Sequence, residues 1–405
     1  MNWSQRFQSA TAPGPNQVTP GAVVMAADSA GNIIHSEARG MTSVEPERAR
    51  PMTVDTPLWI ASCTKLLTTI ATLQMVEQGK IGLDTEVSRH LLEVGALDIL
   101  TGFGSDNQPL LRKPTTPITV HHLLTQQSGM TYDFLNPNLR RWREIHGEEM
   151  LDWEWPVRER CVTPLVYEPG EGWAYSVSMD WAGKLVERLN GDCRLGDYMQ
   201  KHIFEPLGMT MVTFRPLEHD RLREQLADTT ARSGTGELVS TQPYFRGPNR
   251  DPGDDLGGGG LYCTPADYLK VLVSLLANDE KLLGRATVEQ MFTPQLKDAR
   301  ALLSVTQDPE LGPMVRAGVP SKDWQYGYGG TLHTADVPGI CHRGTLSWQG
   351  LPNCYWWIDR TSATCGLYMS QLMPAGDPQS MDLAIDFRRE IFARVNTGTN
   401  GVLGG

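Results

Sequence analysis

The chain has 405 residues and a mass of 44.9 kDa, long enough for two domains or for one domain with a large insertion. Hydrophobic residues make up 40% and charged residues 20%, which supports a packed core and excludes wholesale disorder. The 36 Lys and Arg against 47 Asp and Glu give a net charge of −11, which argues against nucleic acid or an anionic membrane surface as the main partner.

The sequence carries no sign of a membrane span or an export signal. No window approaches the ~20 apolar residues that cross a bilayer, and residues 1–6 lack the apolar start of a secretory signal. The seven cysteines are odd in number and form no CxxC pair, so we expect reduced thiols and a cytoplasmic location. The histidines form no HExxH motif, and we expect neither a metal nor another cofactor.

The first predicted elements are a β-hairpin and a helix. Apolar residues at 21–26 and 33–35 indicate two strands, joined by a turn at 28–32. A helix then begins near Ser62, with apolar residues at helical spacing and Gly79 placed as its C-terminal stop.

The rest of the chain divides into a helical middle and a strand-rich end. From about 85 to 290, loops rich in Pro and Gly separate the helices, which are clearest at 120–126, 179–189 and 265–276. Strand patterns and a last amphipathic helix follow, at 345–348, 354–359, 363–372 and 381–395.

Strands at both ends of the chain and helices between them predict an α/β fold of the α+β type. The economical arrangement is an antiparallel sheet built from both termini and flanked by helices, with a mainly helical region inserted. We place the sheet domain at 1–90 and 291–405 and the inserted helical domain at 91–290.

Ser62-Cys63-Thr64-Lys65 is the only S-x-x-K tetrapeptide of the chain. Because positions i and i+3 share one helix face, Lys65 can reach the Ser62 hydroxyl, and a helix N-terminus favours developing negative charge. Acyl transfer needs this combination of nucleophile, proton acceptor and oxyanion donors. The ordinary alternative is a helix cap followed by an exposed lysine.

For each of two further segments, a packing role and a catalytic role are both possible interpretations. Tyr175-Ser176-Val177 precedes a predicted helix, where the phenol is either a packed aromatic or a base whose pKa a nearby lysine lowers. Trp348-Gln349-Gly350 ends a predicted strand, where it marks a packed bend or lends a backbone N–H to an oxyanion hole.

Taken in order, these three motifs resemble those of the serine β-lactamase-like superfamily, which includes class C β-lactamases, D-alanyl-D-alanine carboxypeptidases and family VIII esterases. The resemblance covers residues from about 18 to 395. Within the superfamily, the segments at 55–70, 179–188 and 347–353 resemble those of the fungal polyketide acyltransferases of lovastatin biosynthesis.

The resemblance implies roles for particular residues. Ser62 would be the nucleophile, Lys65 and Tyr175 would share the general-base task, and the backbone N–H groups of Ser62 and Leu351 would hold the oxyanion. It also implies substrate contacts, which we assign to Trp348, Gln349, Gly350, Trp173 and Tyr132. An acyl donor bound to the carrier-protein domain of a polyketide synthase is likewise implied by the resemblance alone.

The chain departs from the β-lactamase pattern in its third motif. Lys-Thr-Gly is usual there, and an indole at Trp348 supplies no charge for a substrate carboxylate, which disfavours β-lactamase or peptidase activity. His342 and Arg343 lie just upstream and either supply a positive charge or point away. The second motif ends in Val177 instead of the Asn usual in class C enzymes.

Three other patterns have structural explanations. The stretch 27–31 lies in a hairpin turn and not in the strand–turn–helix context of a nucleophile elbow. The glycines at 257–260 lack the GK[ST] ending of a phosphate loop. His121 and His122 lie on a predicted helix, where packing or hydrogen bonding accounts for them.

The expected function is therefore transfer of an acyl group from a thioester or ester, through acyl-Ser62, to an alcohol of a natural product. A carboxylesterase or thioesterase of the same fold is the alternative, and an inactive binding protein is a third. Several tryptophans of the helical region either form an apolar wall that excludes water or belong to the core: Trp142, Trp153, Trp155 and Trp173.

Overall fold

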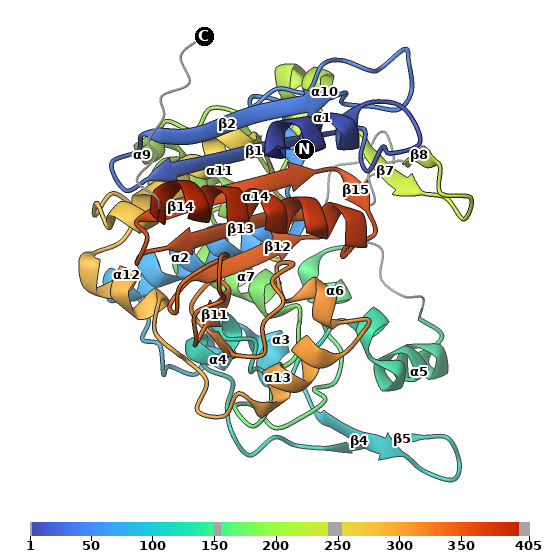
Figure 1. Cartoon of the computed structure of the whole chain (residues 1–405). Helices are drawn as coiled ribbons and strands as arrows, with labels where there is room; N and C mark the ends of the chain where they lie inside the picture. Colours follow the sequence, from blue (N-terminus) through green and yellow to red (C-terminus); the bar gives the residue numbers. More distant parts are fainter. Residues whose placement is uncertain (1, 149–154, 242–252, 397–405) are drawn as a thin grey trace.

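A computed structural model describes residues 2–148, 155–241 and 253–396. Its centre is a seven-stranded sheet in the order β10-β11-β12-β13-β14-β1-β2, with every neighbouring pair antiparallel (Figure 1). The strands are β1 (Gly21–Asp28), β2 (Ile33–Gly40), β10 (Trp324–Tyr326), β11 (Thr331–His333), β12 (Leu346–Gly350), β13 (Cys354–Asp359) and β14 (Thr364–Ser370). This confirms the predicted antiparallel sheet built from both ends of the chain.

Helices cover both faces of this sheet. On one face α1 (Trp3–Thr11) and α14 (Pro378–Asn396) lie across the strands (Figure 1). On the other face α11 (Pro265–Ala277) packs against β1 and β14. Strand β1 is buried on both sides, which explains its unbroken run of small and apolar residues.

Helix α2 (Thr64–Glu77) lies at the centre of the molecule, behind the sheet in Figure 1, and is buried on nearly all sides. It packs against α7 (Ser178–Leu189). Its buried residues include Lys65 and several threonines as well as apolar side chains, so the helix is enclosed by the protein without being uniformly apolar. Gly79, two residues beyond its end, has φ +68°, the left-handed conformation expected of a glycine stop. A short 3₁₀ turn, η1 (Ala61–Cys63), precedes it and carries Ser62.

Short helices and three small sheets complete the described chain. The helices are α3 (Leu92–Gly95), α4 (Val120–Leu124), α5 (Pro137–His146), α6 (Val157–Arg160), α8 (Leu195–Met199), α9 (Glu205–Leu207), α10 (Asp220–Gln225), α12 (Arg285–Met291) and α13 (Arg300–Gln307). The sheets are β3 (Leu58–Trp59)–β9 (Tyr262–Cys263)–β6 (Val212–Thr213), β15 (Leu372–Met373)–β7 (Thr229–Arg232)–β8 (Leu238–Thr241), and β4 (Ile99–Phe103)–β5 (Pro109–Arg112).

The helices expected from apolar periodicity appear as α4, α7, α11 and α14, each within three residues of its predicted ends. The division into a sheet domain and an inserted domain at residues 90 and 290 stays a prediction. Helix α11 lies in the predicted insertion, yet it packs on β1 and β14 of the sheet. Within the described ranges, no helix has the length and apolar character needed to cross a bilayer.

Candidate active site

Ser62 lies in a tight turn that the surrounding backbone holds in place. The residue before it, Ala61, has φ +44°, a left-handed conformation that costs an L-residue energy and often occurs at functional sites. The Thr64 hydroxyl donates to the Ala61 carbonyl at 2.6 Å and accepts the Leu261 N–H at 3.1 Å. Ile60 N–H in turn donates to the Leu261 carbonyl. These bonds hold the Ser62 turn in a single position.

Lys65 lies at the centre of the site and is only 1% exposed. Its Nζ lies 3.2 Å from Ser62 Oγ, as the i, i+3 spacing predicts. It also contacts the Tyr132 hydroxyl at 3.1 Å, the Tyr175 hydroxyl at 3.0 Å and the Gly258 carbonyl at 2.6 Å. The Tyr175 hydroxyl donates directly to Ser62 Oγ. Nucleophile, amine and phenol therefore form one hydrogen-bonded set.

Two phenols meet at Lys65, and their surroundings differ. Tyr132 lies just before the 3₁₀ turn η3 (Asp133–Leu135) and is 5% exposed, toward the pocket that it lines. Burial, with a smaller effect of Tyr175, raises the pKa of Tyr132 well above its usual range, so its phenol stays protonated. Tyr175 donates a hydrogen bond to Ser62 Oγ as well as contacting Lys65.

The third motif forms the wall opposite Lys65. Strand β12 passes so close to the nucleophile turn that a Cβ on Gly350 would overlap the Ile60 carbonyl oxygen. Only glycine allows this approach, and it brings the next residue, Leu351, to the same pocket as Ser62. Trp348 is fully buried beneath Tyr175, with ring centroids 5.6 Å apart in an edge-on arrangement.

The site opens into a small pocket at the protein surface. Most of its surface is apolar or aromatic, and none of the described residues that line it is charged. The residues that line it are Trp59, Ala61, Ser62, Tyr132, Phe134, Tyr175, Gly258, Gly259, Met314, Gln349, Gly350, Leu351 and Ala375.

Of the five expected substrate contacts, Tyr132, Gln349 and Gly350 line this pocket, whereas Trp348 and Trp173 do not. Those two indoles are buried behind the wall, where each packs against Tyr326.

The aromatic wall of the pocket is not formed by the tryptophans of the helical region that the sequence suggested. Trp142 and Trp155 are absent from the lining, and Trp153 lies outside the described residues. The wall is formed by Trp59 and Phe134, which sequence patterns did not indicate. Phe134 follows Tyr132 by two residues, and that adjacency is the one signal that pointed toward it.

Neither His342 nor Arg343 contributes a positive charge to the pocket. The His342 ring bonds to Asp359 at 3.0 Å, and Arg343 is exposed. His121 bonds to the Tyr328 hydroxyl at 2.8 Å, in keeping with a packing role. Among the residues placed by the structure, no group of three or more His, Cys, Asp or Glu could hold a metal.

Comparison with known proteins gives the class to which this fold and site belong. The β-lactamase family profile matches residues 5–389, nearly the whole chain. The chain therefore belongs to the β-lactamase family, and within it to the serine acyltransferases and esterases.

Individual relatives show which branch of the β-lactamase family this chain resembles. The chain is 39% identical to the lovastatin esterase of Penicillium rubens, covering 92% of this chain and 94% of the relative. It is 37% identical to the monacolin J acid methylbutanoyltransferase of Aspergillus terreus, covering 94% and 93%. Unliganded simvastatin synthase (LovD) from Aspergillus terreus superposes with a TM-score of 0.85 at 34% identity, covering 98% of each chain. The expected resemblance to the lovastatin-pathway branch is confirmed.

Proposed function

We propose that this protein is a serine acyltransferase that carries an acyl group on Ser62 to an alcohol of a polyketide-type natural product. The observation that carries the proposal is the hydrogen-bonded set of Ser62, Lys65 and Tyr175 at the base of an uncharged, largely apolar pocket. A cytoplasmic location is part of the proposal and is supported by the free thiols of all seven cysteines.

The geometry supports a two-step reaction. Ser62 Oγ attacks the donor carbonyl while its proton passes to Tyr175 in its phenolate form, whose negative charge the Lys65 ammonium balances before the transfer. The tetrahedral oxyanion is held by the N–H groups of Ser62 and Leu351, and its collapse breaks the bond to the leaving thiol or alcohol, which takes the proton. The acceptor alcohol then gives its proton to the Tyr175 phenolate and attacks the carbonyl of acyl-Ser62. The second tetrahedral intermediate collapses by breaking the bond to Ser62 Oγ, which takes the proton from Tyr175.

The pocket favours a neutral, apolar acyl chain. Trp59, Phe134, Met314 and Leu351 line it, and no described lining residue supplies a cation for a carboxylate. A β-lactam or a peptidoglycan stem peptide would bring such a carboxylate into the site, so the pocket disfavours both. The donor carried by a polyketide synthase's carrier protein, implied by the resemblance, is consistent with this apolar lining.

Hydrolysis is the second candidate, because the chain is as similar to an esterase as to the transferases. The lovastatin esterase relative is 39% identical and the methylbutanoyltransferase 37%. Transfer and hydrolysis share the acyl-Ser62 intermediate and differ only in whether an alcohol or water attacks it. An apolar pocket disfavours water, and we therefore place transfer first.

The test supplies the protein with a short-chain acyl thioester, with and without a panel of polyketide alcohols. Mass spectrometry of the products then compares the new ester with the free acid. Transfer predicts that an accepted alcohol becomes the main product and that Ser62→Ala abolishes both products and the acyl-enzyme mass. Free acid as the main product with every alcohol would favour the hydrolase, and turnover by Ser62→Ala would refute the mechanism.

A further inference from the structure

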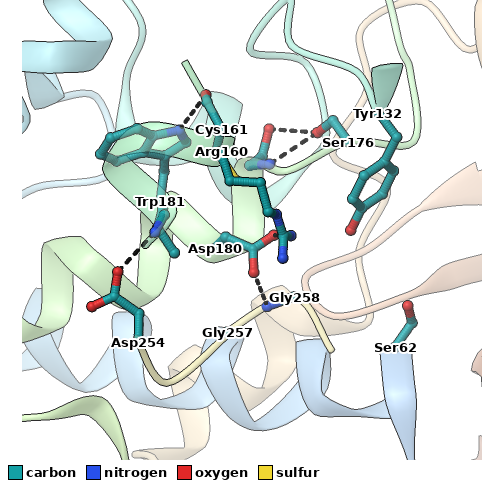
Figure 2. Close-up of polar contacts among 12 residues, drawn as sticks. Ser62, Tyr132, Arg160, Cys161, Ser176, Asp180, Trp181, Asp254, Gly257 and Gly258 are labelled. Atoms are coloured by element: carbon teal, nitrogen blue, oxygen red, sulfur yellow. Dashed lines mark hydrogen bonds and ion pairs between the residues drawn. The ribbon is translucent and has the colours of Figure 1, made fainter. Parts of the chain in front are cut away.

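A buried glycine peptide connects the catalytic lysine to a charged residue outside the pocket. The Gly258 carbonyl accepts from Lys65 Nζ at 2.6 Å, the shortest of the four contacts of that amine. The Gly258 N–H donates to Asp180 Oδ1 at 3.1 Å (Figure 2). A single residue therefore contacts the lysine on one side and the aspartate on the other.

The fit around Gly258 is tight and leaves this peptide little freedom. A Cβ on Gly258 would lie 2.5 Å from Asp180 Oδ2, and one on Gly257 would lie 2.5 Å from the Met179 carbonyl. The Thr68 hydroxyl of α2 donates to the Gly257 carbonyl at 2.8 Å. The glycine loop is thus held between α2, which carries Lys65, and the first turn of α7, which carries Asp180.

Asp180 is fully buried, and so is its charge partner. Arg160, at the end of α6, is 3% exposed, and its Nη2 lies 3.9 Å from Asp180 Oδ2 (Figure 2). The Arg160 carbonyl accepts from Arg143, which also pairs with Asp133, the neighbour of Tyr132. Burying two charges costs several kcal/mol per ion, which their attraction often fails to offset, so stability alone does not account for this pair.

The oxygen atoms around Lys65 Nζ show how the position of Gly258 can control the orientation of the lysine. An ammonium has three N–H donors, whereas Nζ has four oxygen neighbours. The Gly258 carbonyl can only accept, so it always takes one N–H and thereby fixes how the remaining positions face Ser62 and the two phenols. If Gly258 moved, the lysine would turn with it.

We propose that Asp180 is a positioning residue for the acylation of Ser62 and acts through the Gly258 peptide. This inference rests on the proposed function, since it assigns a role to residues that touch neither substrate nor Ser62. Asp180 accepts the hydrogen bond of the Gly258 N–H and so fixes this peptide. The Gly258 carbonyl then accepts from Lys65 and orients its amine toward Ser62 and Tyr175.

Two double variants separate positioning from folding. Arg160→Met with Asp180→Asn removes both charges but keeps an amide oxygen that can accept the Gly258 N–H. Arg160→Met with Asp180→Ala removes both charges and the acceptor. Each variant removes both members of the Arg160–Asp180 pair, so neither leaves one of these two charges buried alone, and the melting temperatures of the two variants are compared with each other.

The readout is the pre-steady-state release of p-nitrophenol from a p-nitrophenyl ester, which reports acylation and needs no acceptor alcohol. The Asn variant should keep a burst rate close to that of the wild type. The Ala variant should lose about 10- to 100-fold in rate with KM unchanged, the cost expected when catalytic groups are misplaced by about 1 Å. Equal burst rates in the two variants, or losses that follow the melting temperatures, would overturn the proposal.

A crystal structure of each double variant gives a readout that does not depend on activity. The Gly258 carbonyl should remain on Lys65 Nζ in the Asn variant and withdraw from it in the Ala variant. An unmoved Gly258 in the Ala variant would refute the inference. If the wild type itself gave no burst, the proposed function would fail, and the positions of Gly258 and Lys65 would still decide this question.

Discussion

At the scale of single residues, the division of labour between two tyrosines decides how Ser62 is activated. Both hydroxyls lie about 3 Å from Lys65 Nζ, at 3.1 Å for Tyr132 and 3.0 Å for Tyr175. Only Tyr175 also donates to Ser62 Oγ. In the proposed mechanism Lys65 stabilises a phenolate at Tyr175, whereas the buried Tyr132 remains a neutral partner.

Replacing each tyrosine by phenylalanine tests this division. Tyr175→Phe should lower the acylation rate by about 10²- to 10⁴-fold, because it removes the group that takes the serine proton. Tyr132→Phe should cost about tenfold or less, equivalent to one hydrogen bond to Lys65. Stopped-flow measurement of the p-nitrophenol burst compares the two. Losses of similar size would mean that the phenols share the task.

The buried phenol also predicts a pH dependence of stability. Burial raises the pKa of Tyr132 well above its usual range in the folded protein, whereas the unfolded chain titrates near pH 10. Its contribution is therefore complete below about pH 10 and decreases as the pH rises, because the unfolded state then releases a proton that the folded state retains. Urea unfolding between about pH 9 and 11 should show a shallower decline for Tyr132→Phe than for the wild type. Parallel curves would contradict this.

At the scale of secondary-structure elements, the site depends on how closely β12 approaches the turn before α2. Gly350 contacts the carbonyl of Ile60 where any side chain would overlap it. This approach sets the distance between the backbone of Leu351 and Ser62, and so the proposed oxyanion hole.

Gly350→Ala should therefore impair catalysis more than folding. The added methyl group must push β12 away from Ile60, and a lost oxyanion donor typically costs about 10²- to 10³-fold in rate. Gly234→Ala is the matched control, because a Cβ there meets no atom within 4 Å and the residue has no positive φ. Burst kinetics and thermal melting of both variants check this. A fully active Gly350→Ala would show that β12 does not set the oxyanion geometry.

The elements also show what the sequence can and cannot predict. Apolar periodicity located α7 and α11, and the S-x-x-K spacing brought Lys65 to Ser62, since these are local properties of one helix. The pocket wall was missed because Trp59, Phe134 and Met314 come from separate segments that only the folded chain brings together. Trp348 was expected to contact substrate, but its place in a strand buried on both faces puts its indole in the core.

At the scale of the whole molecule, the sheet separates a catalytic side from a purely structural side. Phe387 of α14 is fully buried against Trp3 and Trp357 on the face covered by α1 and α14 (Figure 1). Phe134 belongs to the site, where it stacks on Tyr132 and lines the pocket with 41% of its surface exposed. The two phenylalanines are therefore a matched pair for separating stability from function.

Phe387→Ala should lower the free energy of unfolding by about 3–5 kcal/mol, the cost of a large-to-small change in a core, and leave kcat and KM of the folded enzyme unchanged. Phe134→Ala should change the unfolding free energy by less than about 1 kcal/mol, because much of its ring is already solvated. It should instead raise KM for longer acyl chains about tenfold, through lost apolar contact in the pocket. Urea unfolding and steady-state kinetics on esters of increasing chain length measure both effects. A catalytic defect in Phe387→Ala at temperatures where it is fully folded would show that the two faces of the sheet are coupled, and the site could then no longer be treated as independent of the α14 face.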